Sequence, residues 1–179
     1  MNVAPGKLKD VVVIEPKVFG DARGFFLETW SAKRYVDAGV PDAFVQDNIS
    51  FSARGILRGL HFQKPNPQGK LVSVLAGEVY DVVVDLRGDS PTCGQWEPFS
   101  LTGDSKRQVY VPPGFAHGFQ VVSETALFHY KCTDYYAPAN EHTLRWDDPD
   151  LAIPWPVPNP IVSDKDRKGV RLRDLRGEA

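Results

Sequence analysis

The chain has little of what marks several specialised classes of protein. Its 179 residues contain two cysteines, Cys93 and Cys132, which are too few for a disulfide framework and lack the spacing of a metal site. Lys and Arg total 21 against 23 Asp and Glu, and the net charge of -2 shows none of the excess positive charge that is typical of proteins that bind nucleic acid or an anionic membrane. The best apolar run, residues 79–86, is broken by Asp81 and Asp85 and falls far short of the ~18 residues of a membrane span.

The N-terminus and the overall composition narrow the class further. The first residues have no apolar signal core, so we expect a cytoplasmic protein. The 15 glycines and 15 prolines are too many for a helical bundle, whereas 42% hydrophobic and 25% charged residues are typical of a folded globular protein. Because no repeat or shift in composition marks a boundary, the sequence predicts a single, mainly β domain over residues 1–179. Cys132 lies in an apolar run and is expected to be a buried thiol.

Strand-like segments recur at short intervals along the chain. Their residue types and alternation predict strands at 11–14, 24–28, 45–52, 70–75, 78–86, 108–111, 118–122 and 125–133. Ala76-Gly77 joins two of them in a predicted hairpin. Within 45–52, alternation places the even-numbered polar residues on one face and the odd-numbered residues, Asp47 among them, on the other. The absence of βαβ spacing favours an antiparallel sandwich or barrel.

The remaining segments are expected to be short or extended. One short helix is predicted from a Ser31 cap through Val36, and Gly39 ends it. Five prolines between residues 149 and 160 exclude a central strand and predict an extended, proline-rich C-terminal segment that wraps the domain. The charged tail from Ser163 onward is either a short helix or an arm.

The candidate catalytic residues begin with the segment Arg58-Gly59-Leu60-His61-Phe62-Gln63. On a strand, His61 and Gln63 share a face, so His61 is either a structural histidine or a base. Metal-binding barrels use a His-x-His pair with a carboxylate and a distant histidine. Gln63 stands where the second histidine would be, and the other histidines are scattered, so we expect no metal site.

Other polar residues also have a structural and a functional interpretation. Lys70 opens an apolar strand, where it is either an edge charge or a cation for a carbonyl or phosphate oxygen. A Pro-Pro-Gly turn delivers His117 to the predicted start of a strand. Tyr130 and Tyr136 are either packing groups or, in a pocket with little water, proton donors. Arg23 lies beside two phenylalanines and is suited to a surface ion pair or to a phosphate.

The order of these segments is more informative than any one of them. The order is Asp21-x-Arg23-Gly24-Phe25-Phe26-x-Glu28, Gln46-Asp47-Asn48-x-Ser50, Arg58-Gly59-Leu60-His61-Phe62-Gln63, Asp81-Val82-Val83-Val84-Asp85-Leu86-Arg87, Ser90-Pro91-Thr92-x-Gly94-x-Trp96, Val111-Pro112-Pro113-Gly114-Phe115-Ala116-His117-Gly118-Phe119 and Ser163-Asp164-Lys165-Asp166. This succession closely resembles the dTDP-4-dehydrorhamnose 3,5-epimerase family. The resemblance that these segments carry runs from about Val11 to Asp166.

The resemblance implies a fold, an assembly and a reaction. It implies a cupin-like antiparallel jelly-roll barrel, a homodimer formed partly by strand exchange, and no metal or organic cofactor. The implied substrate is dTDP-4-dehydro-6-deoxy-D-glucose, which is inverted at C3 and C5 to dTDP-4-dehydro-L-rhamnose for the rhamnose pathway. Both carbons are α to the C4 ketone, so deprotonation gives an enolate and reprotonation from the opposite face inverts the centre. Such chemistry needs a base, an acid on the other face and a positive group at the enolate oxygen.

The same resemblance assigns the catalytic roles. By similarity, His61 is the base, and Asp166 is the carboxylate that orients the imidazole and stabilises its charged form. Lys70 stabilises the oxyanion, and Tyr130 is the acid on the far face.

It also assigns the substrate contacts. Contacts to the substrate fall at Gln46, Asp47, Asn48, Arg58, His117, Glu141 and Lys165. Arg23 and Glu28 match positions that grip the nucleotide, from the same subunit or from its partner, and a bidentate arginine suits a diphosphate. Tyr136 matches the aromatic residue that stacks on thymine.

Three alternatives stay open at this point. Close relatives with the same histidine, lysine and tyrosine invert only C3 or C5 in antibiotic-sugar pathways, and a ketoisomerase acting on the same sugar is a further alternative within the enzyme class. A binding module for nucleotide sugars would need Arg23, Arg58 and Tyr136 but gives no reason for Lys70 beside a base. A metal-dependent cupin oxygenase is disfavoured by Gln63.

Overall fold

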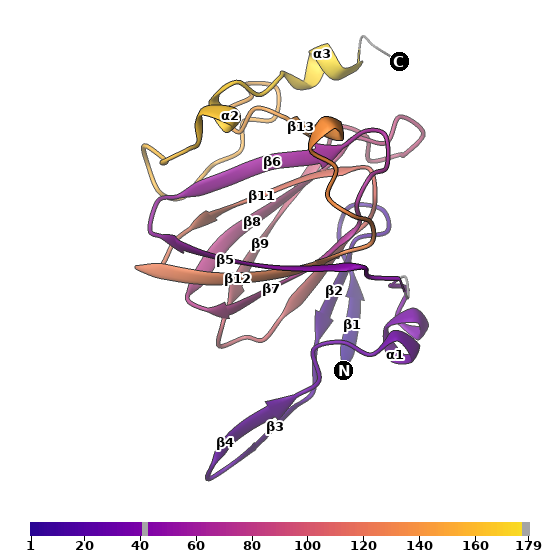
Figure 1. Ribbon diagram of the computed structural model, residues 1–179, viewed down its shortest axis with the longest axis vertical. Coiled ribbons are helices and arrows are strands. Elements are labelled where there is room, and N and C mark those ends of the chain that lie inside the picture. Colours follow the sequence, from indigo (N-terminus) through magenta and orange to yellow (C-terminus); the bar gives the residue numbers. More distant parts are fainter. Residues whose placement is uncertain (41–42, 177–179) are drawn as a thin grey trace.

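Two facing antiparallel sheets make up most of the computed structural model, which describes residues 1–40 and 43–176 (Figure 1). The six-stranded sheet has the order β1 (Asn2–Pro5), β2 (Val12–Glu15), β10 (Gln108–Val111), β7 (Lys70–Ala76), β12 (Thr125–Cys132) and β5 (Gln46–Ala53). The five-stranded sheet has the order β13 (Glu141–Thr143), β6 (Leu57–Gln63), β11 (Phe115–Val121), β8 (Glu78–Asp85) and β9 (Trp96–Thr102). The mainly β, antiparallel jelly-roll prediction is confirmed.

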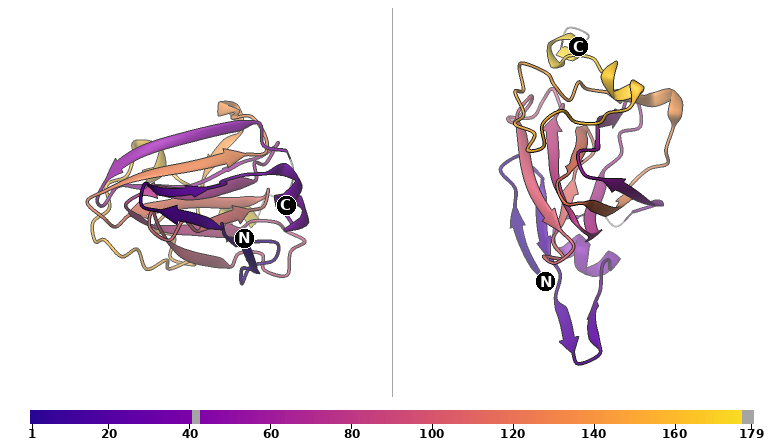
Figure 2. Two further views of the ribbon diagram at one scale, coloured as in Figure 1. Left: turned by 90° about the horizontal axis from the view of Figure 1, so that it is seen from below. Right: turned by 90° about the vertical axis from the view of Figure 1, so that its left-hand side faces the viewer.

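A two-stranded hairpin lies apart from both sheets. It pairs β3 (Val18–Asp21) with β4 (Gly24–Leu27) and projects beyond the sheets near the N-terminus, as both Figure 1 and Figure 2 show. Large apolar side chains on it are exposed, and Phe26 keeps 69% of its surface accessible. A ribbon with so much uncovered apolar surface is typical of an element that packs against another molecule.

The main core lies between the sheets, and alternation determines which residues enter it. On β8, Val79 and Val83 point into this core, and Val82 and Val84 point to the opposite face. That opposite face is covered by the C-terminal segment, which includes Leu151. Because both faces of β8 are buried, its sequence is an almost continuous apolar run.

The proline-rich segment wraps the domain as the sequence predicts. Residues 149–160 form no strand and run over the outer face of the five-stranded sheet. Gln120 on β11 anchors the segment, because its side chain donates to the Val157 carbonyl at 2.8 Å and accepts from the Val157 amide at 3.0 Å.

Three short α-helices are described, whereas the sequence predicts one short helix and leaves a second open in the tail. The predicted helix is α1 (Ala32–Asp37), which ends before Gly39 at a φ of 84°, although the Ser31 side chain makes no capping hydrogen bond. The additional helices are α2 (Asp164–Arg167) and α3 (Leu172–Arg176), and a 3₁₀ turn covers Pro138–Asn140. Helices of four or five residues are too short to show an amphipathic period.

The strand that carries His117 begins earlier than the predicted Gly118. β11 starts at Phe115, so His117 lies within the strand and pairs with His61 on β6 and Val83 on β8. This places two histidines side by side on neighbouring strands. Among the described residues, no helix combines the length and apolar character needed to cross a membrane.

Candidate active site

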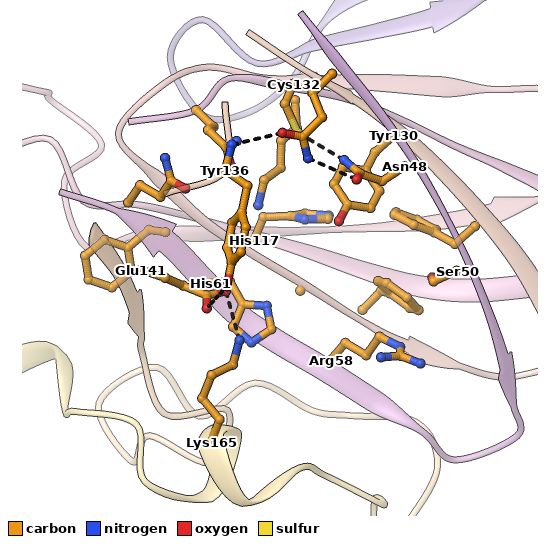
Figure 3. A pocket seen from close by; sticks show the side chains of 18 residues that line it. Asn48, Ser50, Arg58, His61, His117, Tyr130, Cys132, Tyr136, Glu141 and Lys165 are labelled. Carbon is orange, nitrogen blue, oxygen red and sulfur yellow. Dashed lines mark hydrogen bonds and ion pairs between the residues drawn. The ribbon is translucent and has the colours of Figure 1, made fainter. Parts of the chain in front are cut away.

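One cavity of about 370 Å³ opens between the two sheets and receives most of the predicted site residues (Figure 3). Its lining combines amide, imidazole, cationic and phenolic side chains with aromatic rings. The predicted residues that line it are Gln46, Asn48, Arg58, His61, Lys70, His117, Tyr130, Tyr136, Glu141 and Lys165. Residues far apart in the sequence therefore meet at one place.

The six-stranded sheet supplies one wall. The inward face of β5 carries Gln46 and Asn48, as alternation predicts, and β12 and β7 add Tyr130 and Lys70. Burial lowers the pKa of Lys70, and the carboxylate charges of Asp81 and Glu141 only partly oppose this effect. Burial raises the pKa of Tyr130, so its hydroxyl keeps its proton at neutral pH.

The five-stranded sheet supplies the opposite wall and a histidine–carboxylate dyad. His61 on β6 faces the cavity, and its Nε2 donates to Asp166 Oδ1 at 2.6 Å. Because Nε2 carries that proton, Nδ1 is the nitrogen that can accept another. Asp166 does not line the cavity but lies behind His61 with 3% of its surface exposed.

Helix α2 holds Asp166 in place. The Ser163 side chain caps the helix by accepting from the Asp166 amide at 3.1 Å. Burial acts to raise the pKa of the Asp166 carboxyl, but hydrogen bonds from His61 and the Gly59 backbone outweigh it and lower that pKa. The carboxylate is therefore charged at neutral pH and fixes the orientation of the imidazole.

A second polar cluster lies at the rim of the cavity. Glu141 on β13 accepts from the Tyr136 hydroxyl at 2.9 Å and from Lys165 Nζ at 2.8 Å. Burial opposes ionisation of Glu141, but the hydrogen bonds from Lys165 and Tyr136 lower its pKa overall. The Tyr136 amide also donates to the Gln46 side chain at 2.9 Å, which links this rim to β5.

Besides Asp166, three predicted site residues lie outside the cavity. Asp47 points to the outer face of β5, where Lys131 Nζ lies 2.7 Å from its carboxylate. Arg23 and Glu28 lie in or beside the projecting hairpin and pair with Asp21 and Arg34. The alternation that selects Gln46 and Asn48 had already placed Asp47 on the opposite face, so this outcome was readable from the sequence.

Several lining residues were not selected from the sequence, among them Ser50, Gln68, Phe128 and Cys132. Ser50 shares the inward face of β5, and Cys132 lies two residues after Tyr130, so strand alternation was the signal that could have found them. The prediction that Cys132 is a buried thiol is confirmed.

Gln63 also lines the cavity, and its side chain has a structural task there. Its Nε2 donates to the Asn66 carbonyl at 2.9 Å, and its Oε1 accepts from the Ala137 amide at 2.9 Å. Within the described residues, no three His, Cys, Asp or Glu side chains converge in a way that could hold a metal ion.

Comparison with known proteins identifies the family. The sequence model of the dTDP-4-dehydrorhamnose 3,5-epimerase family matches residues 5–174. The chain belongs to this family. It is 53% identical over 169 residues to the dTDP-4-dehydrorhamnose 3,5-epimerase of Pseudomonas aeruginosa, a match that covers 93% of each chain.

A solved structure and a second relative extend the comparison within the family. The Legionella pneumophila dTDP-6-deoxy-D-glucose-3,5-epimerase in complex with dTDP-4-keto-L-rhamnose superposes with a TM-score of 0.94, at 51% identity over 99% of this chain and 95% of that one. The dTDP-4-dehydrorhamnose 3-epimerase of Streptomyces niveus is 40% identical over 98% of this chain and 86% of its own. The family therefore includes relatives named for inversion at two carbons and relatives named for inversion at one.

Proposed function

We propose that the protein is a dTDP-4-dehydrorhamnose 3,5-epimerase that converts dTDP-4-dehydro-6-deoxy-D-glucose to dTDP-4-dehydro-L-rhamnose. At C3 and at C5, a base removes the proton α to the C4 ketone, and an acid returns a proton to the opposite face of the enolate. The identity to the Pseudomonas and Legionella relatives supports this substrate. No redox cofactor is needed, because every step is a proton transfer, and the proposal assigns the positive charge at the enolate oxygen to a side chain of the protein.

One observation carries the proposal: the proposed base and the proposed acid enter the cavity from different sheets. His61 enters the cavity from the five-stranded sheet with Asp166 behind it, and Tyr130 enters from the six-stranded sheet. Inversion needs a proton removed on one face and delivered on the other. A pocket that only bound the sugar would have no use for this pair.

Lys70 is assigned to the enolate oxygen. Its ammonium enters the same cavity, and burial strengthens its interaction with a developing negative charge. One oxyanion serves both inversions, because C3 and C5 flank the same C4 ketone. A single lysine can therefore support both half-reactions.

The remaining polar residues are assigned to binding. Arg58 suits a charged or hydroxylated part of the substrate, and its Nε is held by Ser52 Oγ at 3.0 Å. Tyr136 at the rim is assigned to stacking on thymine; Glu141 accepts from its hydroxyl, and Lys165 in turn donates to Glu141. A nucleotide-sugar substrate also agrees with the cytoplasmic location expected from the sequence.

We include a homodimer in the proposal. Besides Phe26 on the hairpin, the outer face of β5 exposes Ile49 at 61% and Phe51 at 66%. A second copy of the chain would cover both surfaces and would bring Arg23 to a nucleotide bound in its partner. Sedimentation at micromolar concentration tests this: a dimer is expected, and Phe26→Ser should weaken it.

The His61→Ala variant separates an enzyme from a binding module. We expect turnover of dTDP-4-dehydro-6-deoxy-D-glucose to be abolished, because His61 is the residue assigned to remove the proton. We also expect dTDP to bind with nearly the wild-type affinity in calorimetry, because the nucleotide is held by other residues. Near wild-type turnover in this variant would remove His61 from the role of base.

A further inference from the structure

A second histidine–carboxylate pair faces the same cavity, and its acid has no role in the reaction described above. Asp81 on β8 is completely buried, on the face of the strand that carries Val79 and Val83 into the apolar core. Its Oδ2 accepts from His117 Nε2 at 2.7 Å. Its Oδ1 makes no hydrogen bond to any described residue. A buried carboxylate with one unmatched oxygen is costly, and an apolar residue would serve packing better.

His117 connects this carboxylate to the cavity. The ring lines the cavity on the side that lies against Asp81, which we call the cavity floor, and it stacks on Phe128 with 6.0 Å between ring centroids. It is also the cross-strand partner of His61. With Nε2 committed to Asp81, Nδ1 is the atom left for substrate, and within the described part of the chain it has no protein partner.

Asp81 also acts on Lys70, which enters from the other sheet. The carboxylate charge raises the pKa of Lys70 and so opposes the lowering caused by burial. The other charged or titratable groups that act on Lys70 are Cys132 from β12, Glu141 from β13 and Lys165 from α2. Of the two carboxylates that act on Lys70, Asp81 is the completely buried one, and it lies on the face of β8 that enters the apolar core, where little solvent screens its charge.

We propose that Asp81 is a positioning residue that, through His117 and Lys70, keeps the cavity floor positively polarised toward the enolate oxygen. The inference rests on the proposed epimerase function and gives the two histidine–carboxylate pairs different roles in it. The His61–Asp166 pair moves the proton, and the His117–Asp81 pair with Lys70 supports the negative charge that each proton transfer creates. Because that charge lies on one oxygen, Asp81 serves both inversions equally.

The test is Asp81→Asn, which preserves the shape of the side chain and an acceptor for His117 but removes the charge. We expect kcat to fall about 10-fold or more, a part of the loss that follows removal of an oxyanion donor. Deuterium uptake at C3 and C5 should fall together, while KM and dTDP affinity stay within about 2- to 3-fold of wild type, because the nucleotide contacts are intact.

A spectroscopic readout separates this role from a purely structural one. Lysine labelled with ¹³C at Cε reports the pKa of Lys70 by NMR, with Lys70→Met used to assign its signal. Asp81→Asn should lower that pKa, because the opposing negative charge is gone. Asp166→Asn is the matched comparison: it should slow exchange and leave the pKa of Lys70 near the wild-type value.

Each outcome bears on a distinct claim. Should Asp81→Asn fail to fold, Asp81→Leu removes the same charge and suits the apolar surroundings. A folded variant with wild-type kcat and an unchanged Lys70 pKa overturns the inference. Wild-type protein that takes up no deuterium overturns the proposed function instead, and the NMR titration then still tests the link between Asp81 and Lys70.

Discussion

Asp166→Asn tests the dyad on which the proton transfer depends. The change keeps the size of the side chain and removes one negative charge 2.6 Å from His61 Nε2, in a position where only 3% of the residue is exposed. Asparagine can accept or donate a hydrogen bond at this point, but it cannot stabilise the imidazolium that forms when His61 takes a proton.

The expected loss follows from the strength of that contact. A hydrogen bond to a charged group contributes about 1.5–3 kcal/mol, and each 1.36 kcal/mol corresponds to a factor of about ten in rate. The variant should therefore exchange the C3 and C5 protons about 10- to 200-fold more slowly than wild type. Initial rates of deuterium uptake from D₂O, followed by ¹H NMR, measure this directly.

The same helix provides the control. Asp164 is exposed and, within the described ranges, its carboxylate pairs with Arg167 alone, at 2.8 Å, so Asp164→Asn changes the charge of α2 by the same amount without touching His61. We expect this variant to retain the wild-type rate, because an exposed ion pair contributes little. An Asp166→Asn protein that is folded, by thermal unfolding, and exchanges as fast as the control would refute the dyad.

Two further outcomes are expected. Tyr130→Phe removes only the hydroxyl, so the rate of inversion that relies on it should fall by about 10²–10⁴-fold, while His61 still exchanges the proton on its own face. Chiral analysis of the product distinguishes inversion from exchange without inversion. Unimpaired inversion at both carbons would require another acid. Asp85 is buried, and although burial acts to raise its pKa, hydrogen bonds from Arg87, Ser90 and Thr92 lower that pKa to about 2. Because the pKa of Asp85 is lowered in the folded protein, its charge stabilises the fold at any pH above the ordinary carboxyl pKa, and this stabilisation is lost as the pH falls through about 2. Asp85→Ala should therefore reduce the free energy of unfolding at pH 7 by about 3–5 kcal/mol and make it less dependent on pH in acid. An unchanged urea midpoint would contradict this.

Local patterns in the sequence located many of the strands. The hairpin predicted at Ala76-Gly77 is wrong, because β7 and β8 lie in different sheets and do not pair with each other. Alternation in β5 separated Gln46 and Asn48 from Asp47, and the structure places them on opposite faces. The prolines between 149 and 160 excluded a strand for the reason that the structure shows: the segment covers a sheet instead of joining it. These features depend on neighbouring residues, which a single sequence displays.

Features that depend on distant contacts were harder to predict. The start of β11 at Phe115 is set by pairing with β8, which overrides the turn signal of the preceding prolines. The meeting of His61 with Asp166 joins residues 105 positions apart, and only the family resemblance suggested it. Asp81 was visible as an acid in an apolar strand, but its partner His117 lies on another strand and no local pattern links them.

The most direct test of the central claim is incubation of the purified protein with dTDP-4-dehydro-6-deoxy-D-glucose in D₂O, followed by mass spectrometry and NMR of the product. The account predicts deuterium at both C3 and C5 with both centres inverted. Deuterium and inversion at one carbon only would make the protein a single-site epimerase like the Streptomyces niveus relative. No uptake at either carbon, with dTDP still bound, would contradict the account and leave a nucleotide-sugar binding protein.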